Sequence, residues 1–201
     1  MSKNRRIELE RKANSQVERL DFSLRAKSSR ELLESAEGDV DWDRSWHFFA
    51  HSYSRAFEVV WDAEYAGRKE VFKYPLLSIT RHSIELWLKA AFSAVTMTPP
   101  SPGHGLNDLW DKLMDALAEH MGSELDEPYS DAVRHLINTL DSHDGHADRF
   151  RYPTNRNSSK YMSSNVDLDE LYRAHSLITG FCGAVCMQMQ AELYYHDQAL
   201  C

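Results

Sequence analysis

The segment between residues 75 and 95 restricts the fold more strongly than any other part of this chain. Read as an α-helix, it carries apolar side chains over more than half of its circumference. These positions are Leu76, Leu77, Ile79, Thr80, Ile84, Trp87, Leu88 and Ala91. A helix this apolar has to be surrounded by other elements, so we expect it at the centre of the fold. We also expect Trp87 to be buried, in the neighbourhood of Trp46, Leu109 and Ile178.

Four other segments place apolar side chains at helical spacing. They are residues 42–65, residues 105–120, a stretch that opens at Pro128, and a last segment from Asp167 to about residue 196. The prolines of TMTPPSPG (96–103) exclude a continuous helix there, and residues 141–165 are polar and irregular, so both are expected to be loops. No stretch alternates as a strand does. The sequence therefore predicts an all-α fold, an antiparallel four- or five-helix bundle that spans residues 41–201.

Residues 1–40 differ from the rest of the chain because they are dense in charge and carry only a thin apolar face at loose helical spacing. We expect a helical N-terminal extension that packs on the bundle or on a partner, or frays. No run reaches the ~20 apolar residues that a bilayer span needs, and the N-terminus has no apolar signal region. The chain is therefore expected to be cytoplasmic, without contact with a membrane.

The composition also limits the chemistry. The net charge of -8 excludes a general polyanion binder, so contact with nucleic acid would need a local basic patch. Cys182 and Cys186 lie four residues apart on a predicted helix, which favours buried thiols over a disulfide. No group of histidines and cysteines has the spacing of a known metal motif, so we expect neither a metal nor another cofactor.

Polar residues on the central helix form a narrow wedge, made of Ser78, Arg81, His82, Glu85 and Lys89. Arg81 and Glu85, and then Glu85 and Lys89, are i, i+4 pairs. One interpretation is a ladder of ion pairs. The other is the lining of a cleft, because isolated charge on a buried helix is costly.

Three further polar groups are candidates for chemistry. One face of the first core helix carries Arg44, His47, His51 and Arg55. These residues would cleave a phosphodiester, hold a metal through the two histidines, or form a solvated face. His104 lies where a loop meets a helix, as a structural anchor or as an acid or base. The third group is in the 141–165 loop, where it would be a functional group on a rigid scaffold, a solvated turn, or a set of metal ligands without a known motif. It comprises His143, His146, Asp148, Arg149, Arg151 and Tyr152.

Three segments, in order, resemble the HEPN superfamily of helical domains: RHSIELWLKA (81–90), GHGLNDLW (103–110) and DRFRYP (148–153). The resemblance covers roughly residues 42–195. It implies a four- or five-helix bundle that is frequently a homodimer. Many members are metal-independent ribonucleases of toxin–antitoxin, abortive-infection, stress or phage-defence systems, and others are inactive interaction modules. The family's catalytic Arg is followed after four to six residues by His; here no His follows Arg149 or Arg151 at that spacing, and Arg151 and Tyr152 are the best positional matches.

The resemblance therefore implies two functions. The first is a metal-independent endoribonuclease of a bacterial stress, toxin–antitoxin or phage-defence system, which binds RNA and a partner protein of that system. His82 or His104 would be the acid or base, Arg81 and Arg151 would bind phosphate, and Tyr152 would stack on a base. Glu85 or Asp148 would orient an Arg or a His. The alternative is a non-catalytic interaction or dimerisation module; a basic cleft shared by Arg81, His104 and Arg151 would favour the ribonuclease, and their dispersal the module. A metal enzyme built on carboxylates and histidines is a third class.

Overall fold

The backbone of the computed structural model divides into two units, Met1–Val40 and Asp41–Cys201, and every residue that the structure describes belongs to the second. The predicted N-terminal extension therefore lies outside the described residues, as do Arg44, His146 and Asp148. The described ranges are 45–65, 71–100, 102–121, 127–144, 149–154, 157–160 and 166–199.

Five α-helices make up these ranges: α3 (Trp46–Tyr65), α4 (Lys73–Thr96), α5 (Leu106–Met121), α6 (Glu127–Asp144) and α7 (Leu168–Ala199). The described part contains no strand, only an isolated bridge between Thr154 and Lys160. The predicted all-α bundle is confirmed. The prediction that residues 141–144 belong to a loop is wrong, because α6 continues through Asp144, whose side chain is buried and bonded.

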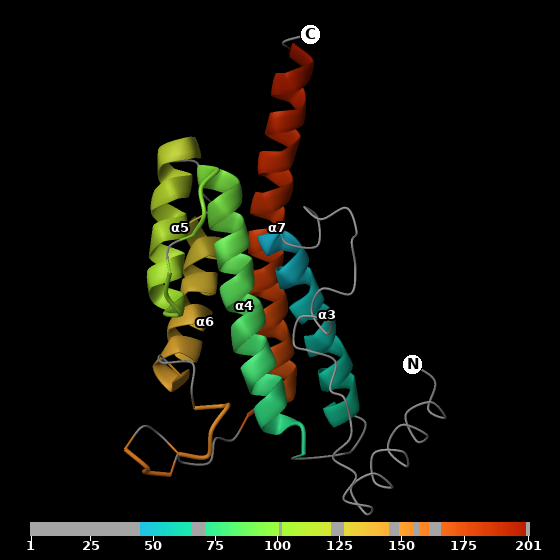
Figure 1. Ribbon diagram of the computed structural model, residues 1–201, viewed down its shortest axis with the longest axis vertical. Helices are drawn as coiled ribbons and strands as arrows, with labels where there is room; N and C mark the ends of the chain where they lie inside the picture. Colours follow the sequence, from blue (N-terminus) through green and yellow to red (C-terminus); the bar gives the residue numbers. More distant parts are fainter. Residues whose placement is uncertain are drawn as a thin grey trace, which may run out of the picture. The chain divides into compact units, whose positions relative to one another are not determined.

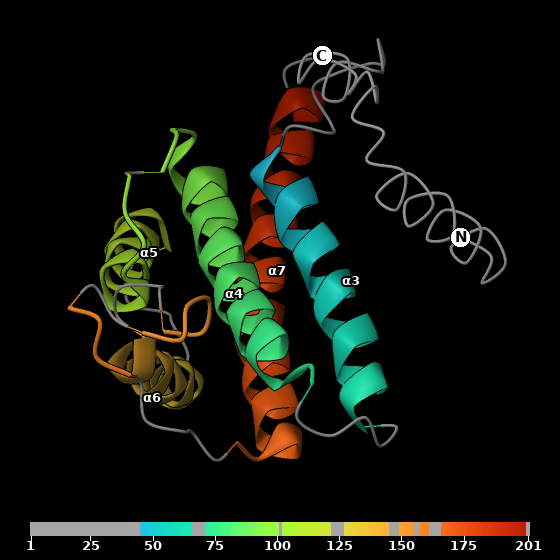
Figure 2. The ribbon, with the colours of Figure 1, turned by 60° about the horizontal axis from the view of Figure 1, so that its bottom comes forward.

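Helix α4 lies at the centre of the bundle, as its apolar circumference predicts. Helices α3 and α7 lie on one side of it and α5 and α6 on the other (Figures 1 and 2). Its buried residues run without a break from Ser83 to Ala91, so it faces neighbours in every direction. Trp87 is 8% exposed and belongs to the same buried cluster as Leu109 and Ile178, which confirms its predicted burial. Trp46 is exposed and does not join that cluster.

A second buried cluster determines where the chain goes after α6. It combines Phe57 of α3, Leu76 and Leu77 of α4, Leu171 of α7 and Phe150 from the segment that follows α6. Burial of a Phe side chain is worth roughly 1.5–3 kcal/mol. Phe150 thus anchors its segment beneath the N-terminal end of α4, and the neighbouring Arg151 is carried to the same place.

The ends of two helices have identifiable caps. Helix α4 ends at Met97, which has a positive φ of 55° and donates its N–H to the carbonyl of Ser93, just before the prolines of the loop. At the start of α7, Asp167 accepts hydrogen bonds from the N–H groups of Asp169 and Glu170. This cap satisfies two backbone donors that a helix leaves unpaired at its start.

The interior of α7 packs closely against α4. A Cβ on Gly183 would stand 3.7 Å from the Trp87 ring, so the indole lies directly against the backbone of α7. Cys182 and Cys186 on the same helix are buried free thiols, as predicted. Burial raises the pKa of Cys186 to about 11, so this thiol stays protonated and unreactive. Among the described residues no helix has the length and apolar character to cross a membrane.

Candidate functional site

The guanidinium of Arg81 joins α4 to the start of α5 and to the end of α6. The side chain is 4% exposed and donates to the backbone carbonyls of Asp144, at 2.9 Å, and of His104. It also pairs with the carboxylates of Glu85 (3.3 Å), Asp141 (3.6 Å) and Asp144 (3.7 Å). These contacts use Nε and both terminal nitrogens of the guanidinium. Arg81 therefore holds three segments together, and the phosphate contact predicted for it would require breaking these bonds.

Glu85 is a buried carboxylate shared by several partners. Its Oε1 atom accepts from Lys89 at 2.8 Å and lies 2.9 Å from Nδ1 of His104, while Oε2 faces Arg81. Nδ1 of His82 is 4.0 Å from the same Oε2. Burial alone would raise the pKa of Glu85, but the hydrogen bonds from Lys89 and His104 hold this pKa below its ordinary value. Glu85 is consequently an ionised acceptor at neutral pH.

The contact with Glu85 orients the His104 ring. An ionised carboxylate can only accept hydrogen bonds, so Nδ1 of His104 must carry the proton that lies between them. The other ring nitrogen, Nε2, is then the atom available to a ligand. The side chain of His104 is 69% exposed, so this nitrogen is within reach of solvent.

A pocket of about 310 Å³ opens over these groups. It is lined by Tyr53, Ser78, Ile79, Arg81, His82, Glu85, His104, Asp144 and Arg151. His82 contributes a 44% exposed side chain, and its ring meets the Tyr53 ring edge-on at 4.5 Å. Burial lowers the pKa of His82, and the positive charges of Lys89, Arg151 and Arg81 add to this effect against the opposing charge of Glu85. His82 is therefore a neutral imidazole at neutral pH.

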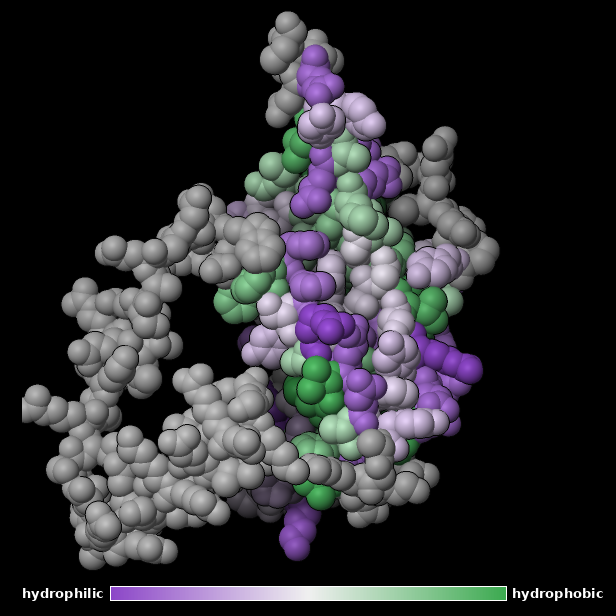
Figure 3. Space-filling view, turned by 90° about the vertical axis from the view of Figure 1, so that its right-hand side faces the viewer, coloured by the Kyte–Doolittle hydropathy of each residue, from purple (hydrophilic) through white to green (hydrophobic). Residues whose placement is uncertain are grey.

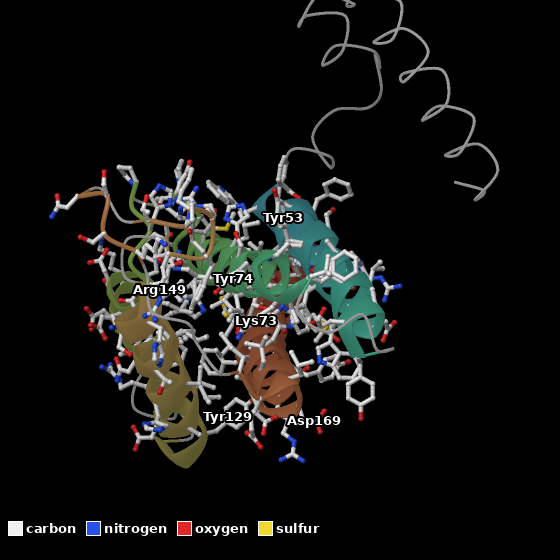
Figure 4. The ribbon with its side chains drawn as sticks, turned by 90° about the horizontal axis from the view of Figure 1, so that it is seen from below. Tyr53, Lys73, Tyr74, Tyr129, Arg149 and Asp169 are labelled. Carbon is white, nitrogen blue, oxygen red and sulfur yellow. The ribbon has the colours of Figure 1, made fainter. Side chains whose placement is uncertain are left out.

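The segment after α6 supplies the outer wall of the pocket. Arg151 lines it, and its guanidinium lies 5.8 Å from the centre of the Tyr152 ring. Both side chains are exposed, although Tyr152 is not among the lining residues. Figure 4 views the bundle from below, where Tyr53 marks α3 and Arg149 marks the segment after α6, with the end of α4 between them. The pocket is thus lined by the exposed Arg151 from this segment and by Tyr53 from α3.

The structure brings five of the seven predicted site residues to one pocket, namely Arg81, His82, Glu85, His104 and Arg151. Tyr152 stands beside it, and Asp148 lies outside the described residues. Two acidic partners of Arg81, Asp141 and Asp144, were not predicted, and neither was Tyr53. The i, i+3 spacing of the two aspartates could have indicated that they share a partner. Tyr53 lies within an apolar stripe, so no sequence pattern marked it as a site residue.

Of the polar face predicted for the first core helix, the described residues His47, His51 and Arg55 do not line this pocket. Arg55 forms an ion pair with Glu58, His51 is exposed, and His47 meets the Trp87 ring edge-on at 5.3 Å. Within the described ranges no three His, Cys, Asp or Glu side chains are grouped so as to hold a metal ion.

A second polar network lies on the opposite face of α4. Nε1 of Trp87 donates to the Ser54 hydroxyl at 2.8 Å, and this hydroxyl is 3.0 Å from that of Ser83. The Ser83 hydroxyl is in turn 3.0 Å from Nε2 of His175. His175 stacks on Phe57, with 3.9 Å between the ring centres, and burial lowers its pKa to about 4. The network links α3, α4 and α7 around a neutral histidine.

The burial of His175 predicts a pH dependence of stability. Its pKa is 6.5 when unperturbed and about 4 in the folded protein, so the unfolded chain binds the proton more readily. The contribution of the neutral His175 to the free energy of unfolding is complete above about pH 6.5. As the pH falls to about 4, this contribution declines by about 3 kcal/mol in total. Urea denaturation of the wild type and of His175→Gln at pH 7 and pH 4 measures it, with His51→Gln as the exposed control. Equal pH dependence in wild type and His175→Gln would contradict the assignment.

No protein-family model matches the chain, and neither does any curated protein or any solved structure.

Proposed function

We propose that the pocket binds RNA and cleaves its phosphodiester backbone without a metal ion, as in the HEPN-type ribonucleases that the sequence resembles. One observation carries the proposal: two accessible imidazoles, His82 and His104, and the cation of Arg151 surround one pocket above the ionised carboxylate of Glu85. RNA supplies its own nucleophile in the 2′-hydroxyl. The protein then needs a base, an acid and a cation at the phosphate.

The two imidazoles suit different steps. His82 is neutral, so it would take the proton from the 2′-hydroxyl as that oxygen attacks phosphorus. In its doubly protonated form His104 would donate the Nε2 proton to the departing 5′-oxygen, and it keeps the Nδ1 proton that is bonded to Glu85. Arg151 would bind the non-bridging phosphate oxygens as their charge increases. The products are a 2′,3′-cyclic phosphate and a free 5′-hydroxyl.

The proposal extends to a bacterial stress, toxin–antitoxin or phage-defence system, on the strength of the resemblance alone. Under it the protein forms a homodimer and binds a partner protein of that system. The C-terminal part of α7 supports assembly, because it extends past the neighbouring helices in Figure 1 and exposes Met187, Leu193, Tyr194 and Tyr195. Figure 3 shows apolar side chains among polar ones on the face that includes the upper part of this helix.

These exposed side chains also favour a second candidate function, a non-catalytic interaction module. In that case the Arg81 and Glu85 network would serve only to hold the helices together. The net charge of -8 agrees with this alternative.

An assay of purified protein on structured and unstructured RNA, with and without EDTA, separates the two functions. We expect cleavage that EDTA does not inhibit and products that end in a 2′,3′-cyclic phosphate. His104→Ala and Arg151→Ala should each lower the rate by about 10²–10⁴-fold, with a much smaller loss of RNA binding. His51→Ala, an exposed histidine that does not line the pocket, is the matched control.

Each contrary outcome has a definite meaning. The absence of cleavage across several RNA types would favour the interaction module. Cleavage that EDTA abolishes would reject both functions and indicate a metal enzyme. Loss of activity in His51→Ala to the same extent as in His104→Ala would place the reaction away from this pocket.

A further inference from the structure

Lys89 is a buried cation that does not line the pocket but contacts the carboxylate beneath it. Its side chain is 9% exposed, and its ammonium donates to Oε1 of Glu85 at 2.8 Å. The same oxygen bonds to Nδ1 of His104 at 2.9 Å. The ring of Trp46, from α3, lies 5.6 Å from the ammonium. Lys89 and His104 are thus held on one oxygen atom, Lys89 from inside the fold and His104 from its surface.

Stability alone does not account for this lysine. Replacing a buried ion pair by apolar residues of similar volume is often neutral or stabilising. Glu85 already has a cationic partner, because its other oxygen faces Arg81. The second cation contacts the same oxygen that binds the histidine, and its hydrogen bond opposes rotation of this oxygen away from His104.

We propose that Lys89 is a positioning residue that acts through Glu85 to fix the ring of His104. This role rests on the proposed function, in which the two imidazoles are the acid and the base. Lys89 itself is too deeply buried to touch a substrate, so it acts only through these neighbours.

The charges around the two imidazoles come from three parts of the chain. Helix α4 contributes Arg81, Glu85 and Lys89, and the segment after α6 contributes Arg151. The carboxylates of Asp141 and Asp144, on α6, face Arg81, while α3 presents the ring of Tyr53 to His82. When Lys89 is removed, the negative charge of Glu85 is less neutralised, so the pKa of His82 rises.

The test compares Lys89→Met, Lys89→Arg, Glu85→Gln and the double variant Lys89→Met/Glu85→Gln. Cleavage rates are measured from pH 5 to pH 9, and ¹⁵N NMR follows the charge of His82 and the tautomer of His104 in the full chain. In Lys89→Met we expect the acid limb of the rate profile to move to higher pH. The rate at its optimum should fall by about tenfold or more, because a catalytic group loses its orientation. Lys89→Arg should restore most of the rate, since it keeps the positive charge.

The double variant separates positioning from folding. It removes both charges of the pair, so it should fold even if Lys89→Met does not. Because Lys89 acts through Glu85, adding Lys89→Met to Glu85→Gln should change the rate by less than about threefold. In wild type His104 should carry its proton on Nδ1, and in Glu85→Gln this preference should be lost.

The proposal is overturned if Lys89→Met leaves the tautomer of His104 unchanged, or if its effect on rate is undiminished in the Glu85→Gln background. A wild type that cleaves no RNA would defeat the proposed function. The NMR results would then still decide whether Lys89 fixes the ring of His104.

Discussion

Replacing Arg81 by methionine is expected to destabilise the protein by about 3–5 kcal/mol. The substitution leaves Glu85, Asp141 and Asp144 as carboxylates without their common cation, and two of these are almost fully buried. It also removes the donors to two backbone carbonyls. Urea denaturation followed by circular dichroism measures the difference in unfolding free energy.

Arg134→Met is the matched control for Arg81→Met. Arg134 also forms an ion pair, with Asp111 at 2.9 Å, but both side chains are about half exposed. Exposed pairs contribute roughly 0–1 kcal/mol, so this variant should remain close to wild type. Similar losses in the two variants would mean that the Arg81 network is no more important than a surface ion pair.

Replacing Trp87 by alanine is expected to cost about 3–5 kcal/mol, as large-to-small substitutions of buried aromatic residues do. The indole fills the space against Gly183 of α7, and its Nε1 donates to Ser54 of α3. Trp87→Ala therefore removes packing against one neighbouring helix and a hydrogen bond to another. Thermal and urea unfolding measure the loss.

Trp87→Phe distinguishes the two contributions. It keeps an aromatic ring against Gly183 but has no donor for Ser54, so it should cost less than Trp87→Ala by roughly 1–3 kcal/mol. A Trp87→Ala protein that unfolds within about 1 kcal/mol of wild type would contradict the burial of this side chain.

The positions of the helices along the sequence were predictable because they depend on local patterns. Apolar spacing placed the central helix at 75–95, and the structure extends it only to Lys73–Thr96. The end of α6 was missed because Asp141 and Asp144 look like loop residues until they meet Arg81. Their hydrogen bonds to Leu106 and Arg149 also come from other parts of the chain. A sequence shows which residues are charged, but not which distant charge will neutralise them.

The sequence predicted which residues form the candidate site better than it predicted what each residue does. His82, Glu85, His104 and Arg151 were found from their residue types and from the family resemblance. The structure adds that Arg81 is enclosed while His104 is exposed, although both were predicted to act on the substrate. Exposure depends on how α5 and α6 cover the helix, which no local pattern encodes. Tyr53 escaped notice because helical spacing assigned it to the core.

The bonds of Arg81 also bear on the order in which the protein folds. They join residues separated by 23 positions, to His104, and by 63 positions, to Asp144. Contacts between distant residues require closure of long loops, whose entropic cost is met before the contacts form. We therefore expect these bonds to form after the transition state for folding. Weakening them should accelerate unfolding more than it slows folding, so the Arg81 network determines chiefly how long the folded protein persists.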